Sequence, residues 1–85
     1  MNSSLNQQVA DKLREMADLL EQQGANPFRV SAYRHAATTL VNLEQDLRDV
    51  FEKEGLKGLM ALPGIGQGIA SAIHEILSTG RWSQL

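Results

Sequence analysis

The segment over residues 62–70, LPGIGQGIA, has the residue types and spacing in this chain that are best suited to chemistry. It holds no acid, base or nucleophile, but Pro63 ends a helix because proline lacks an N–H group and clashes with the preceding turn. Gly64 and Gly66 can adopt a positive φ and allow another backbone to approach closely. An amphipathic run follows, so the unpaired N–H groups of its first turn point back into the hairpin. Converging amides at the positive end of a helix dipole bind anions, and the segment therefore predicts contact with a nucleic-acid phosphate.

A plain turn between two helices is the alternative interpretation of the Pro-Gly pair. Apolar residues recur at helical spacing on both sides of this pair, at Leu59, Leu62, Ile65, Ile69 and Ile73. The full pattern favours a helix-hairpin-helix unit, which we expect over about residues 56–80.

Charge limits how strongly such a unit can bind a polyanion. Eight Lys and Arg residues stand against ten Asp and Glu residues, and the net charge is −2. This is unusual for a DNA-binding protein, whose affinity depends largely on neutralising phosphates. The negative charge is concentrated in residues 1–24 and 44–54, outside the hairpin and outside residues 29–35. DNA binding is therefore allowed, but we expect it to be weak.

The length and composition indicate one small domain over residues 1–85. The absence of cysteine excludes a disulfide framework and a thiolate metal site. The sequence has no apolar run of membrane-spanning length and no signal-peptide pattern, so we expect a soluble cytoplasmic protein with no membrane partner.

Helical periodicity continues along the rest of the chain, with no strand pattern. We predict an all-α fold, a compact bundle of four to five short helices ending in the helix-hairpin-helix motif. The first helix is expected over about residues 5–23, with a capping box from Ser4 to Gln7 and a stop at Gly24. Asn26 and Pro27 open the second helix. Its expected inward face is Phe28, Ala32, Ala36, Leu40 and Leu43, with Ala36 and Ala37 allowing a close helix contact.

The third helix is expected to be capped by Asn42 and ended by Gly55. Its expected inward residues are Leu43, Leu47, Val50 and Phe51. The two hairpin helices follow at residues 56–62 and about 67–79, and Gly80 stops the second. The second is expected to bury Ile69, Ala70, Ile73, Ile76 and Leu77, and Trp82 is expected to cover part of the core.

Residues 24–37 (GANPFRVSAYRHAA) and 59–80 (LMALPGIGQGIASAIHEILSTG) together resemble the amino-terminal, lyase-type domain of the family X, DNA polymerase beta-like, DNA polymerases. The resemblance covers most of the chain. NPFR-x-x-AYR-x-AA joined to LPGIG is far more specific than LPGIG alone. The resemblance implies a helical domain that binds DNA with a 5′-phosphate at gaps, with a role in DNA repair.

The resemblance also implies a lyase, and this sequence departs from that chemistry. The family's nucleophile is a lysine amine that must be neutral to form a Schiff base, and its position matches Ala72. The family's second, phosphate-binding lysine matches Gly68, and a further basic residue matches Gln84. We therefore expect a non-catalytic chain. Residual lyase activity through Lys57 is the least favoured alternative.

Arg29 and Tyr33 share a helix face and match positions that touch the family's phosphate pocket. A guanidinium can grip phosphate oxygens in a fork, whereas the alternative for Arg29 is an ion pair with a neighbouring acid. The alternative for Tyr33 is a core ring with its hydroxyl at the edge. The predicted DNA-phosphate contacts are Gly64, Gly66, Gly68, Arg29, Tyr33, Lys57 and Arg81. The predicted ligands of a monovalent cation, Na⁺ or K⁺, are the backbone carbonyls of Met60, Leu62 and Ile65, where water is the alternative.

Two functions from different classes remain. The first is weak, sequence-independent binding of DNA backbone, with a dissociation constant of about 10⁻⁴ M and a salt slope of about −2 to −3. The second is a protein-interaction module, docking on a partner or on itself. The acidic helix faces and the missing lysines at Gly68 and Ala72 favour this second function. An exposed apolar patch would support it.

Overall fold

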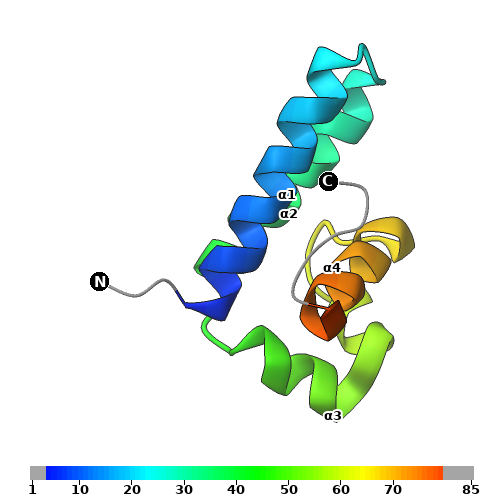
Figure 1. Ribbon diagram of the computed structural model, residues 1–85. Helices are drawn as coiled ribbons and strands as arrows, with labels where there is room; N and C mark the ends of the chain where they lie inside the picture. Colours follow the sequence, from blue (N-terminus) through cyan, green and yellow to red (C-terminus); the bar gives the residue numbers. More distant parts are fainter. Residues whose placement is uncertain (1–3, 80–85) are drawn as a thin grey trace.

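The computed structural model describes residues 4–79, which form an all-α bundle (Figure 1). Its helices are α1 (Leu5–Gln22), α2 (Pro27–Asn42), α3 (Leu47–Met60) and α4 (Gln67–Thr79). Gly55 bends α3 with a φ of 65° and a ψ of −148°, so α3 consists of two short helices. The predicted fold class and the predicted break at Gly55 are both confirmed.

The two ends of α1 are closed by the residues that the sequence indicated. The Ser4 hydroxyl accepts the N–H of Gln7 at 3.1 Å. The Gln7 side chain instead donates to Asp11, so only the serine half of the capping box is correct. At the other end Gly24 has a φ of 74°. The N–H groups of Gly24 and Ala25 donate to the carbonyls of Glu21 and Leu20, which is the Schellman pattern of helix termination.

α2 lies antiparallel beside α1, and both alanines expected to allow this approach, Ala36 and Ala37, are fully buried (Figure 1). The buried stripe of α2 is Val30, Tyr33, Ala36, Ala37 and Leu40. The prediction for Phe28 is wrong, because its side chain is 84% exposed. Two residues turn a helix by about 200°, so a stripe through Val30 places Phe28 on the opposite side.

The start of α3 also differs from the prediction. Asn42 is the last residue of α2, and the N-cap of α3 is Asp46, whose carboxylate accepts the N–H of Arg48 at 2.8 Å. The Asn6 side chain of α1 closes the same end from another element. Its oxygen accepts the N–H of Leu47 at 2.8 Å, and its nitrogen donates to the Gln45 carbonyl at 2.7 Å. This tertiary capping fixes α3 four residues later than the sequence suggested.

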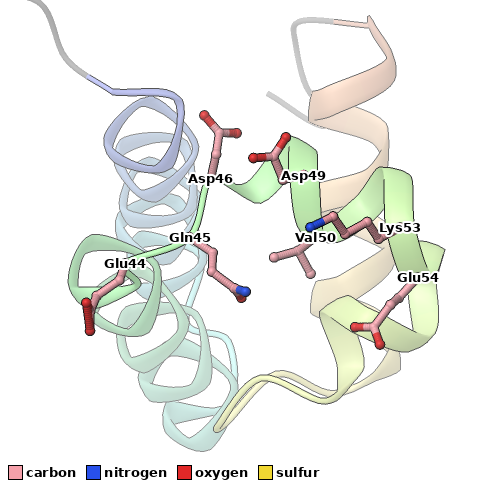
Figure 2. A pocket seen from close by; sticks show the side chains of 7 residues that line it. All are labelled: Glu44, Gln45, Asp46, Asp49, Val50, Lys53 and Glu54. Carbon is pink, nitrogen blue, oxygen red and sulfur yellow. The ribbon is translucent and has the colours of Figure 1, made fainter.

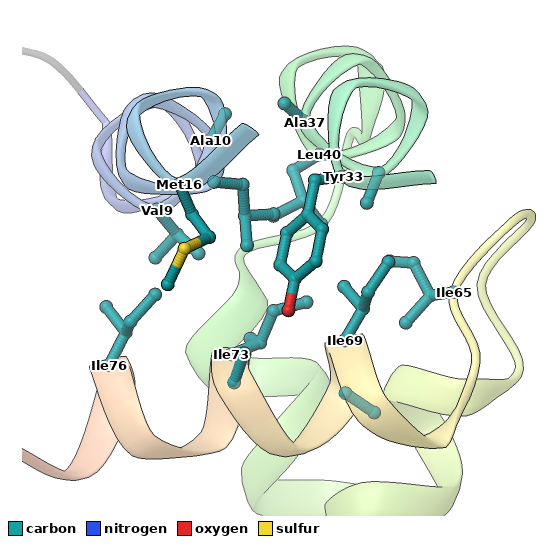
Figure 3. Close-up of a cluster of buried hydrophobic side chains, with 14 of the residues drawn as sticks. Val9, Ala10, Met16, Tyr33, Ala37, Leu40, Ile65, Ile69, Ile73 and Ile76 are labelled. Carbon is teal, nitrogen blue, oxygen red and sulfur yellow. The ribbon is translucent and has the colours of Figure 1, made fainter. Parts of the chain in front are cut away.

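α4 is predicted correctly in its bounds, and its inward residues pack against α1 and α2 (Figure 3). The residues predicted to be buried, Ile69, Ala70, Ile73, Ile76 and Leu77, are all buried, and so is Ala72. The helix before the hairpin ends at Met60 rather than at residue 62. Gly80, Arg81, Trp82 and Gln84 lie outside the described residues. Within residues 4–79, the helices are too short or too polar to span a membrane.

Candidate nucleic-acid interface

The hairpin turn joins α3 to α4 through the Pro63-Gly64 pair. The Leu62 carbonyl accepts the N–H of Ile65 at 3.2 Å, and Gly64 has a φ of 74°. Proline at the second position and a positive-φ glycine at the third fit a type II turn. The predicted conformational role of Gly64 is therefore confirmed. The same role predicted for Gly66 is wrong, because Gly66 is not among the residues with positive φ.

Two contacts hold this turn in place beside α2. The Ile65 side chain is buried in the core between the hairpin and the α1–α2 pair (Figure 3). The Thr39 hydroxyl of α2 donates to the Pro63 carbonyl at 3.1 Å. The hairpin therefore has a defined position relative to α2, although no local sequence pattern indicates the long-range Thr39 contact.

The first turn of α4 begins with a residue that has no side chain. The Gly66 carbonyl accepts the N–H of Ala70 at 2.9 Å, which makes Gly66 the N-cap. In residues 4–79, the N-terminal turns of the other three helices each have a side-chain oxygen bound to an amide, from Ser4, Asn26 and Asp46. No side-chain oxygen of the described residues is bound to the amides of residues 67–69. These amides are left to a ligand or to water.

The open turn of α4 faces part of α2 across a shallow depression of about 430 Å³, the hairpin depression. Its lining residues are Arg29, Ala32, Tyr33, Gly64, Gly66, Gly68 and Ile69. The structure thus brings together five of the seven residues predicted to contact phosphate. Lys57 does not line the depression, and Arg81 lies outside the described residues. The Tyr33 ring is largely buried and extends from α2 toward α4 (Figure 3).

The two arginines of α2 differ in their surroundings. Arg34 pairs with Asp18 at 3.0 Å and with Glu21 at 3.1 Å, both on α1. The hydrogen bonds that Arg34 donates to the carboxylates of Glu21 and Asp18 raise the pKa of Arg34. Arg29 is exposed and has no ion pair in the described part of the chain. The ion pair considered for Arg29 thus occurs at Arg34, and the charge of Arg29 is left unneutralised at the depression.

The glycines of the depression differ from the buried glycine of α3. A Cβ at Gly58 would lie 2.7 Å from the Cβ of Glu54, so the packing of α3 excludes a larger residue there. A Cβ at Gly66 or Gly68 would meet nothing within 4 Å. Glycine inside a helix is less stable than alanine by about 1 kcal/mol, and the fold gains nothing from it at position 68. What these two glycines provide is an open backbone surface.

A second hollow, of about 270 Å³, lies between the α2–α3 link and α3 (Figure 2). It is lined by four carboxylates and one ammonium, from Glu44, Asp46, Asp49, Glu54 and Lys53. This excess of negative charge disfavours an anion. Among the described residues, the hairpin depression is therefore the better candidate for a phosphate.

The two positions predicted to match the family's lysines, Ala72 and Gly68, lie in different environments. Ala72 is buried among the core residues of α4, whereas Gly68 is exposed and lines the depression. Neither side chain can carry an amine. The cation ligands predicted at Met60, Leu62 and Ile65 are backbone carbonyls around the turn, and the Leu62 oxygen already accepts one hydrogen bond. Carbonyl oxygens have two lone pairs, so this oxygen keeps a second acceptor site.

Comparison with known proteins agrees with this geometry. Residues 4–82 match the family described as the helix-hairpin-helix domain. The chain belongs to this family. The domain is 42% identical over 73 residues to the DNA polymerase/3′-5′ exonuclease PolX of Bacillus subtilis (strain 168). The aligned region is 86% of this chain and 12% of that protein, so the domain spans a small part of its relative. The similarity to a helix-hairpin-helix domain of family X polymerases is thereby confirmed.

Proposed function

We propose that this helix-hairpin-helix domain binds the DNA backbone, including a terminal 5′-phosphate, weakly and without sequence preference. The observation that carries the proposal is the hairpin depression. There the first turn of α4 and the guanidinium of Arg29 line one surface, and within residues 4–79 the turn has no side-chain cap and the guanidinium has no ion pair. Helix N-termini bind phosphate through backbone N–H groups and the helix dipole, and arginine adds a fork of donors. The family and the polymerase relative support DNA as the ligand.

The lining of the depression also supports binding without sequence preference. Apart from Arg29 and Tyr33, its members are glycines, one alanine and one isoleucine. Sequence is read by hydrogen bonds to base edges, and this surface offers mainly backbone amides, which suit phosphate oxygens. With one cation at the site and a net charge of −2, we infer a dissociation constant of about 10⁻⁴ M at physiological salt.

We further propose that the domain is non-catalytic. Schiff-base chemistry needs a lysine amine at the reacting carbon, and no lysine lines the depression. The resemblance to the family matches Ala72 and Gly68 to its two lysines, and neither residue has an amine. A monovalent cation on the carbonyls of Met60, Leu62 and Ile65 is part of the same proposal, and so are a cytoplasmic location and a role in DNA repair. A bound cation would stabilise the turn from the side of its carbonyls.

A protein-interaction function is the second candidate, and one observation favours it. Leu56 and Met60 are four residues apart on the short helix before the hairpin, and they are 37% and 44% exposed. These two apolar side chains are a contact that a protein partner or a second copy could use. Sedimentation of the isolated domain distinguishes self-association from binding to another protein, because self-association raises the measured mass as the concentration increases.

The deciding experiment is an amide NMR titration with a gapped duplex that carries a 5′-phosphate, at low and at moderate salt. We expect shifts at Gly64, Gly66, Gly68 and Arg29 that weaken as salt increases, because phosphate contacts release counterions. A duplex ending in a 5′-hydroxyl is the matched ligand control. The amides of Asp49 and Lys53, at the acidic hollow, are the internal control. An unmoved hairpin at low salt would contradict the proposal and favour the protein-interaction function.

A further inference from the structure

The hydroxyl group of Thr39 donates to a carbonyl outside its own helix. A threonine inside a helix often donates to the carbonyl one turn back in the same helix. The neighbouring Thr38 does so, and its hydroxyl donates to the Arg34 carbonyl at 3.2 Å. The Thr39 hydroxyl instead donates to the Pro63 carbonyl in the hairpin turn, 24 residues further along the chain, at 3.1 Å. This bond therefore joins α2 to the turn and does not serve the helix itself.

The Pro63 carbonyl belongs to the central peptide of the turn, the peptide that joins Pro63 to Gly64. A proline-glycine pair can form a type I or a type II turn, and the two types differ in a rotation of this central peptide. The bond from the Ile65 N–H to the Leu62 carbonyl closes both types, and glycine adopts either sign of φ about equally well. Neither feature selects the orientation. Gly64 has the positive φ of a type II turn, and the Thr39 hydroxyl holds the carbonyl in that orientation.

The orientation of this peptide also decides where the Gly64 N–H group points. The C=O and N–H groups of a trans peptide point in opposite directions, and the described residues contain no cis peptide. Because the Pro63 carbonyl is directed toward Thr39, the Gly64 N–H is directed away from it. Within residues 4–79 this N–H has no backbone acceptor. Gly64 lines the hairpin depression, where its amide can donate to a phosphate oxygen.

Thr39 itself does not line the depression. The α2 residues that do are Arg29, Ala32 and Tyr33. Thr39 follows Ala32 by seven residues, which is about 10 Å along the helix. Its hydroxyl is also already used in the bond to Pro63. Thr39 therefore acts on a phosphate in the depression through the turn and not by contact.

We propose that Thr39 is a positioning residue of the phosphate site, whose hydroxyl holds the Pro63-Gly64 peptide so that the Gly64 N–H faces the phosphate. This inference rests on the proposed function. Without the hydroxyl, the central peptide exchanges between its two orientations, and the fraction of molecules with the Gly64 N–H in place falls. The measured affinity falls with that fraction, because only the correctly oriented turn donates this hydrogen bond.

The test compares T39V, which keeps the shape of threonine without the hydroxyl, with T39S, which keeps the hydroxyl. T39V is expected to lower the affinity for a gapped duplex with a 5′-phosphate about fivefold, the effect of losing one neutral hydrogen bond. T39S should bind as the wild type does. T38V is the matched control, because it removes the adjacent hydroxyl bond inside α2, and it should leave the affinity unchanged. Affinities are measured by NMR titration at low salt, where phosphate contacts are strongest.

A measurement without DNA tests the turn separately from the proposed function. In free T39V, the amide resonance of Gly64 should shift relative to the wild type, because the peptide that carries this N–H changes its orientation. T39S should restore the wild-type position, and T38V should not move it. Neither threonine belongs to the hydrophobic core, so all three variants are expected to fold as the wild type does.

Three outcomes would overturn the inference. If T39V binds DNA as tightly as the wild type does, the turn keeps its orientation without the hydroxyl, and a loss of affinity in R29A would still support the phosphate site. If T39S binds as weakly as T39V, or if T38V weakens binding equally, the effect does not come from the bond to Pro63. If the wild type does not bind the duplex at low salt, the proposed function fails, and the inference fails with it. A shifted Gly64 resonance in free T39V would then show that Thr39 orients the turn for stability alone.

Discussion

The two helix hairpins of this protein are built from similar residues and are closed in different ways. The α1–α2 link contains Gly24 and then Pro27, and the α3–α4 link contains Pro63 and then Gly64. In the first link, Asn26 caps α2 with its side chain, and the Schellman bonds close the end of α1. In the second, Gly66 caps α4 with its backbone carbonyl alone. The residue before the helix thus decides whether a helix N-terminus is satisfied by the protein or is left open to a ligand.

The two arginines of α2 differ in the same way as the two hairpins. Arg34 is bound to two acids of α1 and connects the helices of the first hairpin. Arg29 faces the second hairpin and has no ion pair among the described residues. The first hairpin therefore uses its polar groups for stability. The second has backbone amides and a guanidinium without protein partners in residues 4–79, as the proposed phosphate site requires.

The largest effect on stability is expected from removing the Asn6 side chain, which caps the N-terminus of α3. Asn6→Ala deletes the amide that binds both the Leu47 N–H and the Gln45 carbonyl. These groups lie at a buried contact, and an unsatisfied buried donor costs about 1–3 kcal/mol. We expect a loss of about 2 kcal/mol in the free energy of unfolding, measured by urea denaturation. An unchanged midpoint would show that water replaces the Asn6 side chain.

The next largest effect, on DNA affinity, should follow from giving the N-terminus of α4 a side-chain cap. Gly66→Asp gives α4 a side-chain cap like those of Ser4, Asn26 and Asp46. We expect the free energy of unfolding to rise by a few tenths of a kcal/mol. The affinity for a 5′-phosphorylated duplex should fall about tenfold, or about 1.4 kcal/mol, because a carboxylate occupies the amides and repels phosphate. Fluorescence anisotropy measures the affinity, and thermal unfolding measures the stability.

The control for Gly66→Asp is a change of the same size at a helix end away from the depression. Ser4→Gly removes the cap of α1 and should lower stability by a few tenths of a kcal/mol without changing DNA affinity. If Gly66→Asp binds DNA as tightly as the wild type does, the amides of α4 do not hold the phosphate. The comparison between the two hairpins would then have no functional meaning.

The sequence was sufficient where the signals are local. The helix ends at Ser4, Gly24 and Asn26 were predictable because each depends on residues a few positions away. The hairpin was predictable for the same reason, since Pro63 and Gly64 define the turn and the apolar spacing defines the helices. Arg29 and Tyr33 could be assigned to the same site because they lie one turn apart and match the family's motif.

The errors lie where tertiary contacts decide between equivalent local patterns. Asn42 and Asp46 are both good caps, and the choice is made by Asn6, about forty residues earlier in the chain. Phe28 was misplaced because α2 is rich in alanine, and a stripe through Phe28 and one through Val30 fit the periodicity equally well. The hydrogen bond from Thr39 to Pro63 has no signature in the sequence at all.

A smaller effect is expected from replacing Gly68, which lines the hairpin depression, than from replacing a glycine that the core packing requires, such as Gly58. Gly68→Ala should raise the free energy of unfolding by about 0.5–1 kcal/mol, because an added Cβ meets nothing within 4 Å. It should also weaken DNA binding, since the methyl group stands on the surface that the phosphate approaches. Gly58→Ala is the matched control and should destabilise the domain, because its Cβ would lie 2.7 Å from that of Glu54. A stability loss in Gly68→Ala would show that the fold itself requires this glycine.

The smallest effect is expected at Arg34. Arg34→Ala removes both ion pairs to α1, but these pairs are exposed, and exposed pairs contribute little. Arginine stays charged far above neutral pH, so salt rather than pH is the variable that tests the pair. The small loss of stability should disappear in about 1 M salt, where the Debye length is about 3 Å. Arg29→Ala is the matched change and should lower DNA affinity without lowering stability. If Arg34→Ala weakened DNA binding as much as Arg29→Ala does, the division between a structural and a ligand-binding arginine would be wrong.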